Sequence, residues 1–314
     1  MTKKNIFGIL AFTVICSHLF LSGSCASAAV SAQEYYAIGM AYFDLGRFED
    51  AERWLNRAIQ ADRTMVASAY NLGRLAFERQ RYDEAASYFE SILRRDPDNI
   101  LALRAAAYTR IATGEIEIAD MHYSRLLTLV PESADDGYNH SLVLFAMGRY
   151  SQAEEVLQRY PFSLMDNRDS LLLYARTQAA LNKVEAINSF TGYLAVHSDP
   201  KVRFEYAQTL EYHEFFARAL EEYRLALTET AAASTDPHRN DIRFSIARVL
   251  LIADSESSAG IEELETAVSG GYNNTDAIEK LMNDSRLSTE NINSLRNILS
   301  SMHRQEESAD NNNY

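Results

Sequence analysis

The sequence of 314 residues predicts an all-α protein, a solenoid built from stacked helical hairpins. Three regularities with a period of 34 residues lead to this prediction. Alanine recurs at Ala51, Ala85, Ala119 and Ala153, and a bulky residue stands four places after each, at Leu55, Phe89, Tyr123 and Leu157. Glycine stands five places before three of these alanines, at Gly46, Gly114 and Gly148. A fixed period of this length indicates similar supersecondary units that pack side by side, rather than one globular core.

Each unit is predicted to be a pair of helices because its apolar residues recur at spacings of three and four. In the first unit the pattern occupies Tyr35, Ile38, Tyr42 and Leu45 and then Phe48, Ala51, Leu55 and Ala58. Gly46 stands between the two runs, where the first helix should end in a left-handed residue, which glycine adopts without a Cβ penalty. Gly39 lies within the first helix, where glycine costs about 1 kcal/mol relative to alanine. We therefore expect the partner helix to approach closely at Gly39.

The second unit, VASAYNLGRLAFERQRYDEAASYFESILRRDPDN, resembles the tetratricopeptide repeat family. It carries that family's signature residues at Gly73, Tyr82, Ala85, Phe89 and Pro97. The resemblance implies a right-handed α-solenoid. It covers residues 32–270 in about seven repeats, of which those within 32–133 are the most regular.

Residues 271–303 are predicted to form helices that cap the last hairpin. One apolar set, Ile278, Leu281, Met282 and Leu287, would cover the open end of the stack, and a second set, Ile292, Leu295, Ile298 and Leu299, has amphipathic spacing. Open-ended solenoids need such caps for solubility. The tail at 304–314 has almost nothing to bury and is predicted to be disordered.

The N-terminus predicts export. Lys3 and Lys4 precede an uncharged run from Ile6 to Leu21. At about 1.5 Å per residue this run is shorter than a hydrocarbon core of about 30 Å, so it indicates a signal peptide rather than a spanning helix. The signal is expected to occupy residues 1–24, with cleavage allowed up to residue 32. Signal peptidase could cut after Ala28 or after Ala32, or the segment LSGSC could act as a relaxed lipobox with Cys25 as the lipidation site. Both routes stay open.

Charge and motif content argue against several classes of function. The formal net charge of −14 argues against nucleic acid as a partner, which needs a basic surface, and against docking on anionic headgroups through the protein surface. Membrane attachment is therefore expected only through a lipid at Cys25. The seven histidines show no metal-ligand spacing, and neither a phosphate-binding loop nor a nucleophile elbow is present. No enzyme activity, cofactor or metal is predicted.

The resemblance also locates a candidate binding face, because the first helix of each hairpin lines the concave groove in this family. Projection of the same helical turns from successive repeats predicts seven partner-binding residues: Tyr36, Tyr70, Arg74, Phe77, Arg104, Tyr108 and Tyr138. Arg176, Gln208 and Arg248 continue the same projection in later repeats. Tyr, Phe and Arg are the types that dominate binding hot spots, although aromatic residues at helical spacing also serve as packing. The family's carboxylate clamp is not predicted, because only Asn71 matches it.

These observations predict a noncatalytic protein-interaction scaffold in the bacterial cell envelope, periplasmic or lipid-anchored to a membrane that faces the periplasm. It would bind a peptide or protein segment in the concave groove. The alternative is a ligand-binding accessory protein of a transport system, which would hold a small molecule within the solenoid. An open groove would favour the first hypothesis, and a closed pocket the second.

Overall fold

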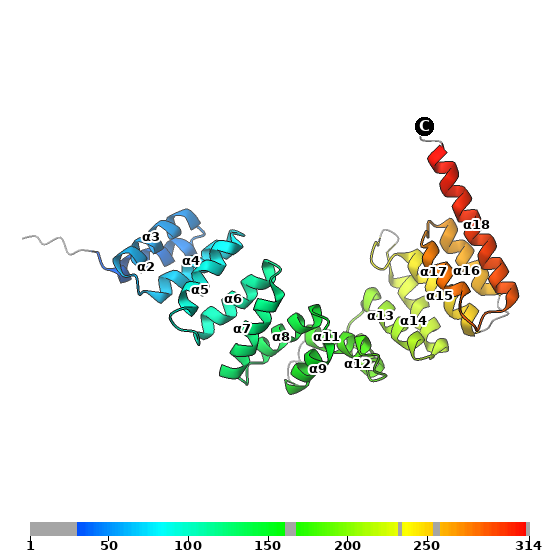
Figure 1. Cartoon of the computed structure of the whole chain (residues 1–314), viewed down its shortest axis with the longest axis horizontal. Helices are drawn as coiled ribbons and strands as arrows, with labels where there is room; N and C mark the ends of the chain where they lie inside the picture. Colours follow the sequence, from blue (N-terminus) through cyan, green and yellow to red (C-terminus); the bar gives the residue numbers. More distant parts are fainter. Residues whose placement is uncertain (1–29, 161–167, 232–233, 254–257, 312–314) are drawn as a thin grey trace, which may run out of the picture. The chain divides into compact units, whose positions relative to one another are not determined.

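The computed structural model describes residues 30–160, 168–231, 234–253 and 258–311, and within these ranges it forms sixteen helices and no strand (Figure 1). The chain divides into two compact units, Met1–Leu129 and Val130–Tyr314. The predicted signal peptide and Cys25 lie outside the described residues. None of the helices in the described ranges has the length and apolar character that a membrane span requires.

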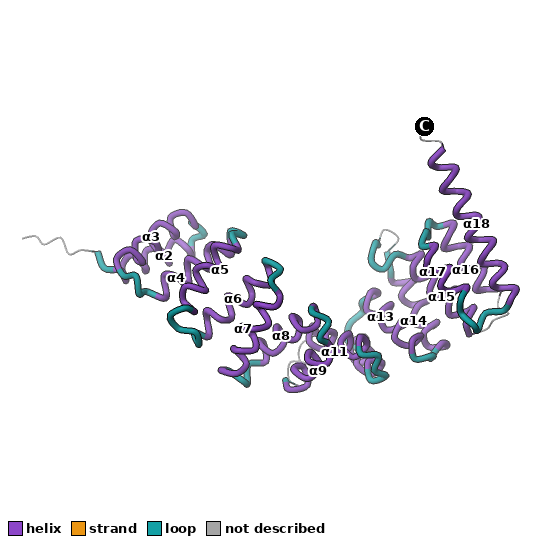
Figure 2. The backbone as a smooth tube through the Cα atoms, viewed as in Figure 1, coloured by secondary structure: helices purple, strands orange, loops and turns teal. Residues whose placement is uncertain are grey.

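Unit 1 consists of three consecutive hairpins, each made of a first and a second helix. Their helices are α2 (Ala32–Asp44) with α3 (Phe48–Ala61), α4 (Val66–Glu78) with α5 (Tyr82–Leu93), and α6 (Ile100–Ala112) with α7 (Ile116–Leu129). These are the hairpins that the 34-residue period predicts. In Figure 2 they follow one another as paired helices joined by short loops.

Unit 2 continues the pattern with four hairpins and a cap. The hairpins are α8 (Ala134–Ala146) with α9 (Tyr150–Arg159), α11 (Arg168–Ala180) with α12 (Ala186–Leu194), α13 (Pro200–Tyr212) with α14 (Phe216–Glu229), and α15 (Arg239–Ala253) with α16 (Ser258–Ser269). The cap consists of α17 (Thr275–Met282) and α18 (Thr289–Asn311). The predicted class, an all-α solenoid of helical hairpins, is confirmed.

The residues that define the period form the core of each hairpin. The alanines at 51, 85, 119 and 153 are completely buried, and Leu55, Phe89, Tyr123 and Leu157 four places later are at most 1% exposed. Gly39 and Gly73 on the first helices face two of these bulky side chains. A Cβ at Gly39 would lie 2.8 Å from Leu55 Cγ, and one at Gly73 would lie 2.6 Å from Phe89 Cε1. The close helix approach expected at Gly39 is confirmed.

The turns within the first six hairpins share a residue with positive φ, whether or not that residue is glycine. Gly46, Gly114 and Gly148 have positive φ angles of 69°, 78° and 71°. In other hairpins the equivalent residue is Gln80 or Asn182, with φ angles of 59° and 55°. Non-glycine residues seldom adopt this region, so the packing of the two helices imposes the turn where the local sequence does not favour it.

Two further helices follow the last hairpin, and the second of them is long. Ile278 of α17 and Leu295 of α18 are fully buried in a cluster that includes Leu264 of α16. The backbone of α18 stays helical to Asn311, beyond residue 303, where the disordered tail was predicted to begin. A helix extends at little cost once its first turns are held by packing.

The close contact at Gly73 leads to a stability prediction. Gly73→Ala should destabilise unit 1 by about 1–3 kcal/mol, because the new methyl group would overlap the ring of Phe89. Gly192 in α12 is the matched control, since a Cβ there would meet no atom within 4 Å. Gly192→Ala should stabilise unit 2 by about 0.5 kcal/mol through helix propensity and reduced unfolded-state entropy. Urea midpoints of both variants test this, and a shift in the same direction for both would contradict it.

Candidate functional site

The candidate site is the surface carried by the first helices of successive hairpins, called the first-helix face below. In unit 1 these helices are α2, α4 and α6, and in unit 2 they are α8, α11, α13 and α15. The second helices cover the other side of each first helix through the buried residues of the period. Each unit carries its own clefts on this face.

In unit 1 the first-helix face holds a cavity of about 220 Å³ between α4 and α6. Three of the seven predicted binding residues, Arg74, Phe77 and Tyr108, line it. The rings of Phe77 and Tyr108 are 5.3 Å apart, and Tyr108 is 57% exposed. The guanidinium of Arg74 lies 4.9 Å from the centre of the Phe43 ring and donates to Asn71 Oδ1 at 3.0 Å. The cavity therefore combines the exposed ring of Tyr108 with the guanidinium of Arg74, which Phe43 and Asn71 hold in position.

The other four predicted residues have different surroundings. Tyr36 is half-buried, and its hydroxyl accepts a hydrogen bond of 3.2 Å from Asn71 Nδ2, which links α2 to α4. Tyr70 is half-buried with its ring 5.6 Å from that of Phe89. Both tyrosines thus contribute to packing. Arg104 is half-buried and has a partner, but it does not line the cavity of unit 1.

Tyr138 belongs to unit 2, on α8, and is therefore not part of the unit 1 cavity. Its side chain is half-buried. Burial, and secondarily the negative charge of Asp169, raises the pKa of Tyr138, so the phenol stays protonated at neutral pH.

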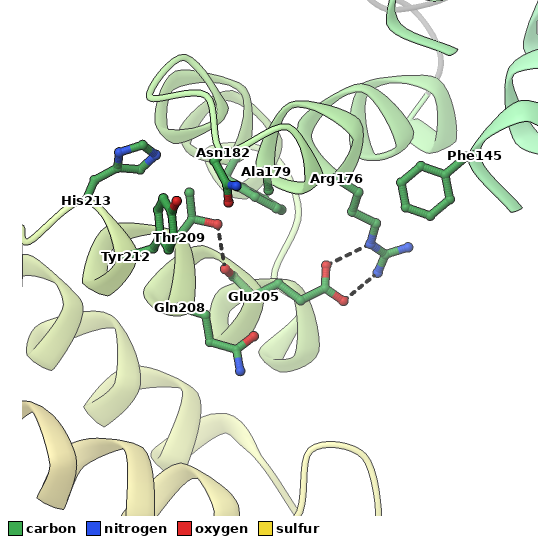
Figure 3. A pocket seen from close by; sticks show the side chains of 10 residues that line it. Phe145, Arg176, Ala179, Asn182, Glu205, Gln208, Thr209, Tyr212 and His213 are labelled. Atoms are coloured by element: carbon green, nitrogen blue, oxygen red, sulfur yellow. Dashed lines mark hydrogen bonds and ion pairs between the residues drawn. The ribbon is translucent and has the colours of Figure 1, made fainter. Parts of the chain in front are cut away.

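In unit 2 a larger cleft, of about 410 Å³, opens between α11 and α13 (Figure 3). Phe145, Ala179 and Phe190 supply its apolar wall. Arg176 donates from Nε to Glu205 Oε2 at 2.7 Å and from Nη2 to Oε1 at 2.9 Å, a bidentate pair that joins the two helices. Such pairing gives a fixed geometry as well as charge compensation. One wall of the cleft is therefore apolar. The other wall carries Arg176 and Glu205, whose charges compensate each other.

Polar groups without partners face the same cleft. The side-chain amides of Asn182 and Gln208 line it, are exposed and form no hydrogen bond with another described residue. His213 also lines it, and its Nε2 is buried without a partner among the described residues. Tyr212 is 62% exposed beside them. An amide side chain offers both a donor and an acceptor, which matches the hydrogen-bonding needs of a peptide backbone.

A second cleft of unit 2, of about 430 Å³, shares Gln208 and Tyr212 with the first, so the two form a continuous surface on α13. Arg248 of α15 donates to Glu211 from Nε at 2.6 Å and from Nη2 at 2.8 Å. The Tyr223 hydroxyl donates to the same carboxylate at 2.7 Å. This network joins α13, α14 and α15 beneath the cleft.

The pKa shifts in this network show how strongly it is held. Burial lowers the pKa of Arg248, but the hydrogen bonds and charge of Glu211 outweigh burial, so the pKa lies above its ordinary value. Burial, and then the charge of Glu211, raises the pKa of Tyr223 well above its ordinary value. Arg248 and Tyr223 therefore both keep their protons throughout the physiological pH range.

The sequence-based set missed the unit 2 cleft residues Asn182, Glu205, Tyr212 and His213. A signal for the cleft existed in the repeat register. Arg176 stands six residues before the left-handed Asn182, as Arg74 stands six before the left-handed Gln80. Arg176 and Gln208 were in the projection, but nothing in the sequence showed that a cleft opens beside them. No cluster of three or more His, Cys, Asp or Glu side chains in the described ranges is arranged to hold a metal ion.

Hairpins of two antiparallel helices that repeat along the chain define a helical repeat protein. Residues 36–100 match the family model of the tetratricopeptide repeat. A tetratricopeptide repeat protein from Parabacteroides merdae ATCC 43184 has a similar structure, with 22% identity, a TM-score of 0.54, and coverage of 80% of this chain and 97% of that chain. YrrB, also a tetratricopeptide repeat protein, is 16% identical with a TM-score of 0.52, over 62% of this chain and 98% of its own. Residues 36–100 of this chain therefore match tetratricopeptide repeats, and its hairpin fold is similar to that of solved tetratricopeptide repeat proteins.

A curated relative is also similar in sequence. An uncharacterized lipoprotein of Treponema pallidum (strain Nichols) is 25% identical over 173 residues, which are 55% of this chain and 87% of that protein.

The network around Glu211 leads to a second stability prediction. Glu211→Gln keeps the shape of the side chain but leaves Arg248 without its carboxylate, so unit 2 should lose about 2 kcal/mol, the range for hydrogen bonds to charged groups. Glu221→Gln on α14, at an exposed position, should change stability by less than about 0.5 kcal/mol. Urea unfolding of both variants measures the difference, and equal midpoints would mean that the network contributes nothing.

Proposed function

We propose that this chain is a noncatalytic scaffold of the bacterial cell envelope that binds a peptide or protein segment on its first-helix face. The proposal rests on one observation: in each unit, an exposed tyrosine ring lines a cleft on this face. Tyr108 is 57% exposed and Tyr212 is 62% exposed, and each lines a cleft on this face. Large rings in such positions supply contact area at a low cost in conformational entropy.

The chemistry of the unit 2 clefts favours an extended peptide. Asn182 and Gln208 can bond to a peptide backbone, while Phe145 and Phe190 offer an apolar wall to a side chain. The two clefts of this unit share residues along α13, so a bound segment could continue from one into the other. YrrB is described as a tetratricopeptide repeat protein with an unusual peptide-binding site, which supports the compatibility of this fold with peptide ligands.

The alternative, a small molecule held for a transport system, has one observation in its favour. A cleft of about 410 Å³ falls in the range of small-molecule sites, which span roughly 300–1,000 Å³. The continuation of this cleft into the second one argues for a longer ligand, so we favour the peptide.

The envelope location rests on the sequence and on one relative. The charged start, the apolar run and the small residues before position 32 support export. The relative from Treponema pallidum is a lipoprotein, which supports lipidation at Cys25 over soluble release.

Mass spectrometry of the protein from its native host tests the location. We expect removal of residues 1–24 and a diacylglyceryl group on Cys25, because LSGSC is the segment that a lipoprotein signal peptidase would process. A terminus after Ala28 or Ala32 without lipid would instead assign a soluble periplasmic protein. An intact Met1 in the cytosol would refute export altogether.

Site-specific photocrosslinking tests the binding face. A photoreactive phenylalanine analogue at Tyr108 or Tyr212 should crosslink to an envelope protein in the native host, because these rings are exposed beside the clefts. Met121 and Leu225 provide matched control positions, since they are exposed apolar residues on second helices.

The captured partner then allows an affinity measurement. Tyr212→Ala should weaken binding about thirtyfold, the effect of removing an anchor worth about 2 kcal/mol, and Leu225→Ala should change it little. Crosslinks at the control positions alone would place the interaction on the second helices. If the purified protein instead retains a small molecule in native mass spectrometry and no protein is captured, the alternative function is favoured.

A further inference from the structure

A separate cleft in unit 1 lies away from the first-helix face, between the first and second hairpins. Its volume is about 460 Å³, and its walls come from the end of α3, the start of α4 and the outer side of α5. Met65, Val66 and Ile92 are among its apolar residues, and Val66 is 40% exposed. The cleft is thus larger than the unit 1 cavity on the first-helix face and is open to solvent.

Three exposed arginines, Arg63, Arg94 and Arg95, surround this cleft. None of them forms an ion pair with a carboxylate of a described residue. Arg95 Nη1 donates to the backbone carbonyl of Arg63 at 3.2 Å, which holds two of the arginines together. Asp62 lies within electrostatic range of Arg95, but its carboxylate accepts from Thr64 N and Oγ1 instead.

Several other arginines of unit 1 form ion pairs. Those in and near the turns pair with acids: Arg47 with Asp50, Arg79 and Arg81 with Glu52, and Arg110 with Glu90 and Glu115. In the next space between hairpins, Arg125 pairs with Asp98 at 2.5 Å. Arg63, Arg94 and Arg95 thus outnumber the two adjacent carboxylates, Asp62 and Asp96, which accept hydrogen bonds from Thr64 and Asn99, in a chain with a net charge of −14.

The topology places this cluster at the end of unit 1 where the described chain begins. Because the two helices of a hairpin are antiparallel, the start of α2, the loop between α3 and α4, and the loop after α5 lie along one edge of the stack (Figure 2). The turns within the hairpins lie along the opposite edge. Ser31, which caps α2, is thus on the same edge as the three arginines.

The chain length from Cys25 limits how far this edge can be from a membrane. Ser31 is six residues after Cys25, so the extended chain between them spans at most about 20 Å. With a lipid on Cys25, this edge of unit 1 stays close to the headgroup layer. Exposed charges act over about 8–10 Å at physiological ionic strength, so the local cluster rather than the net charge of the whole chain determines the interaction there.

We propose that the cleft formed by Arg63, Arg94 and Arg95 binds the phosphate headgroup of an anionic phospholipid and orients unit 1 on the membrane. Guanidinium groups match phosphate oxygens in geometry, and the neighbouring Met65, Val66 and Ile92 suit the glycerol and first acyl carbons. The orientation rests on the lipid anchor proposed at Cys25, whereas the affinity for the headgroup does not.

Vesicle flotation tests the affinity without the anchor. The mature chain from residue 25, carrying Cys25→Ser and no lipid, is mixed at low salt with vesicles of equal parts phosphatidylglycerol and phosphatidylcholine, or of phosphatidylcholine alone. We expect binding only to the anionic vesicles. The triple variant Arg63→Gln/Arg94→Gln/Arg95→Gln should bind about a hundredfold more weakly, which is roughly 3 kcal/mol for three arginines near the surface.

Two further variants make the result specific. Arg224→Gln/Arg296→Gln/Arg304→Gln removes the same charge from exposed positions of unit 2 and should bind as the parent protein does. Arg63→Lys/Arg94→Lys/Arg95→Lys keeps the charge and should retain most of the binding. Circular dichroism melting checks that all variants are folded.

Other results would contradict headgroup binding by this cleft. Absence of binding to the anionic vesicles, or equal losses in both glutamine variants, would overturn the proposal. Calorimetric binding of inorganic phosphate or of an oligoglutamate peptide that depends on the three arginines, without vesicle binding, would instead assign the cleft to a soluble anion. Because the tested chain has no lipid, these results do not depend on the anchor at Cys25 or on the first-helix face.

Discussion

The structure depends on close contact between the two helices of each hairpin at one place, where a small residue on the first helix faces a bulky side chain on the second. Gly39 meets Leu55 and Gly73 meets Phe89, each sixteen residues further along the chain. A side chain at these positions would push the helices apart and remove contacts that a close-packed interior requires. This contact also directs one side of every first helix toward its partner and leaves the other side for the clefts.

Ion pairs between neighbouring first helices line the clefts of unit 2. Arg176 of α11 pairs with Glu205 of α13, and Arg248 of α15 pairs with Glu211 of α13. Because these charges are already compensated, a ligand would gain little from them directly. Recognition would depend instead on Tyr212, on the free amides of Asn182 and Gln208, and on the apolar wall. A peptide backbone with an apolar side chain fits that chemistry better than a highly charged ligand does.

The first-helix face and the basic cleft of unit 1 show why net charge is a poor guide to a solenoid. If the net charge of −14 is taken as spread evenly over the protein, it argues against any contact with anionic headgroups. Each repeat, however, exposes its own charges, and dissolved salt screens the interaction between exposed charges on distant repeats. Arg63, Arg94 and Arg95 form no ion pair with a described carboxylate, whereas Arg125 in the next space between hairpins forms one with Asp98. A local test such as the vesicle experiment is therefore more informative than the isoelectric point.

The sequence by itself determined the hairpin architecture, because the 34-residue recurrence of alanine and bulky residues is a direct record of local packing between neighbouring helices. It also identified Arg74, Phe77 and Tyr108 as neighbours on one face, which the structure brings together in one cavity. Only the tertiary structure decided that Tyr36 and Tyr70 serve in packing and that a larger cleft opens beside Tyr212. Likewise, the left-handed turn at Gln80 and the unpaired state of Arg63 and Arg94 follow from how whole hairpins stack. Periodicity reports which side of a helix is apolar, but burial, partner geometry and cleft shape depend on contacts between residues far apart in the chain.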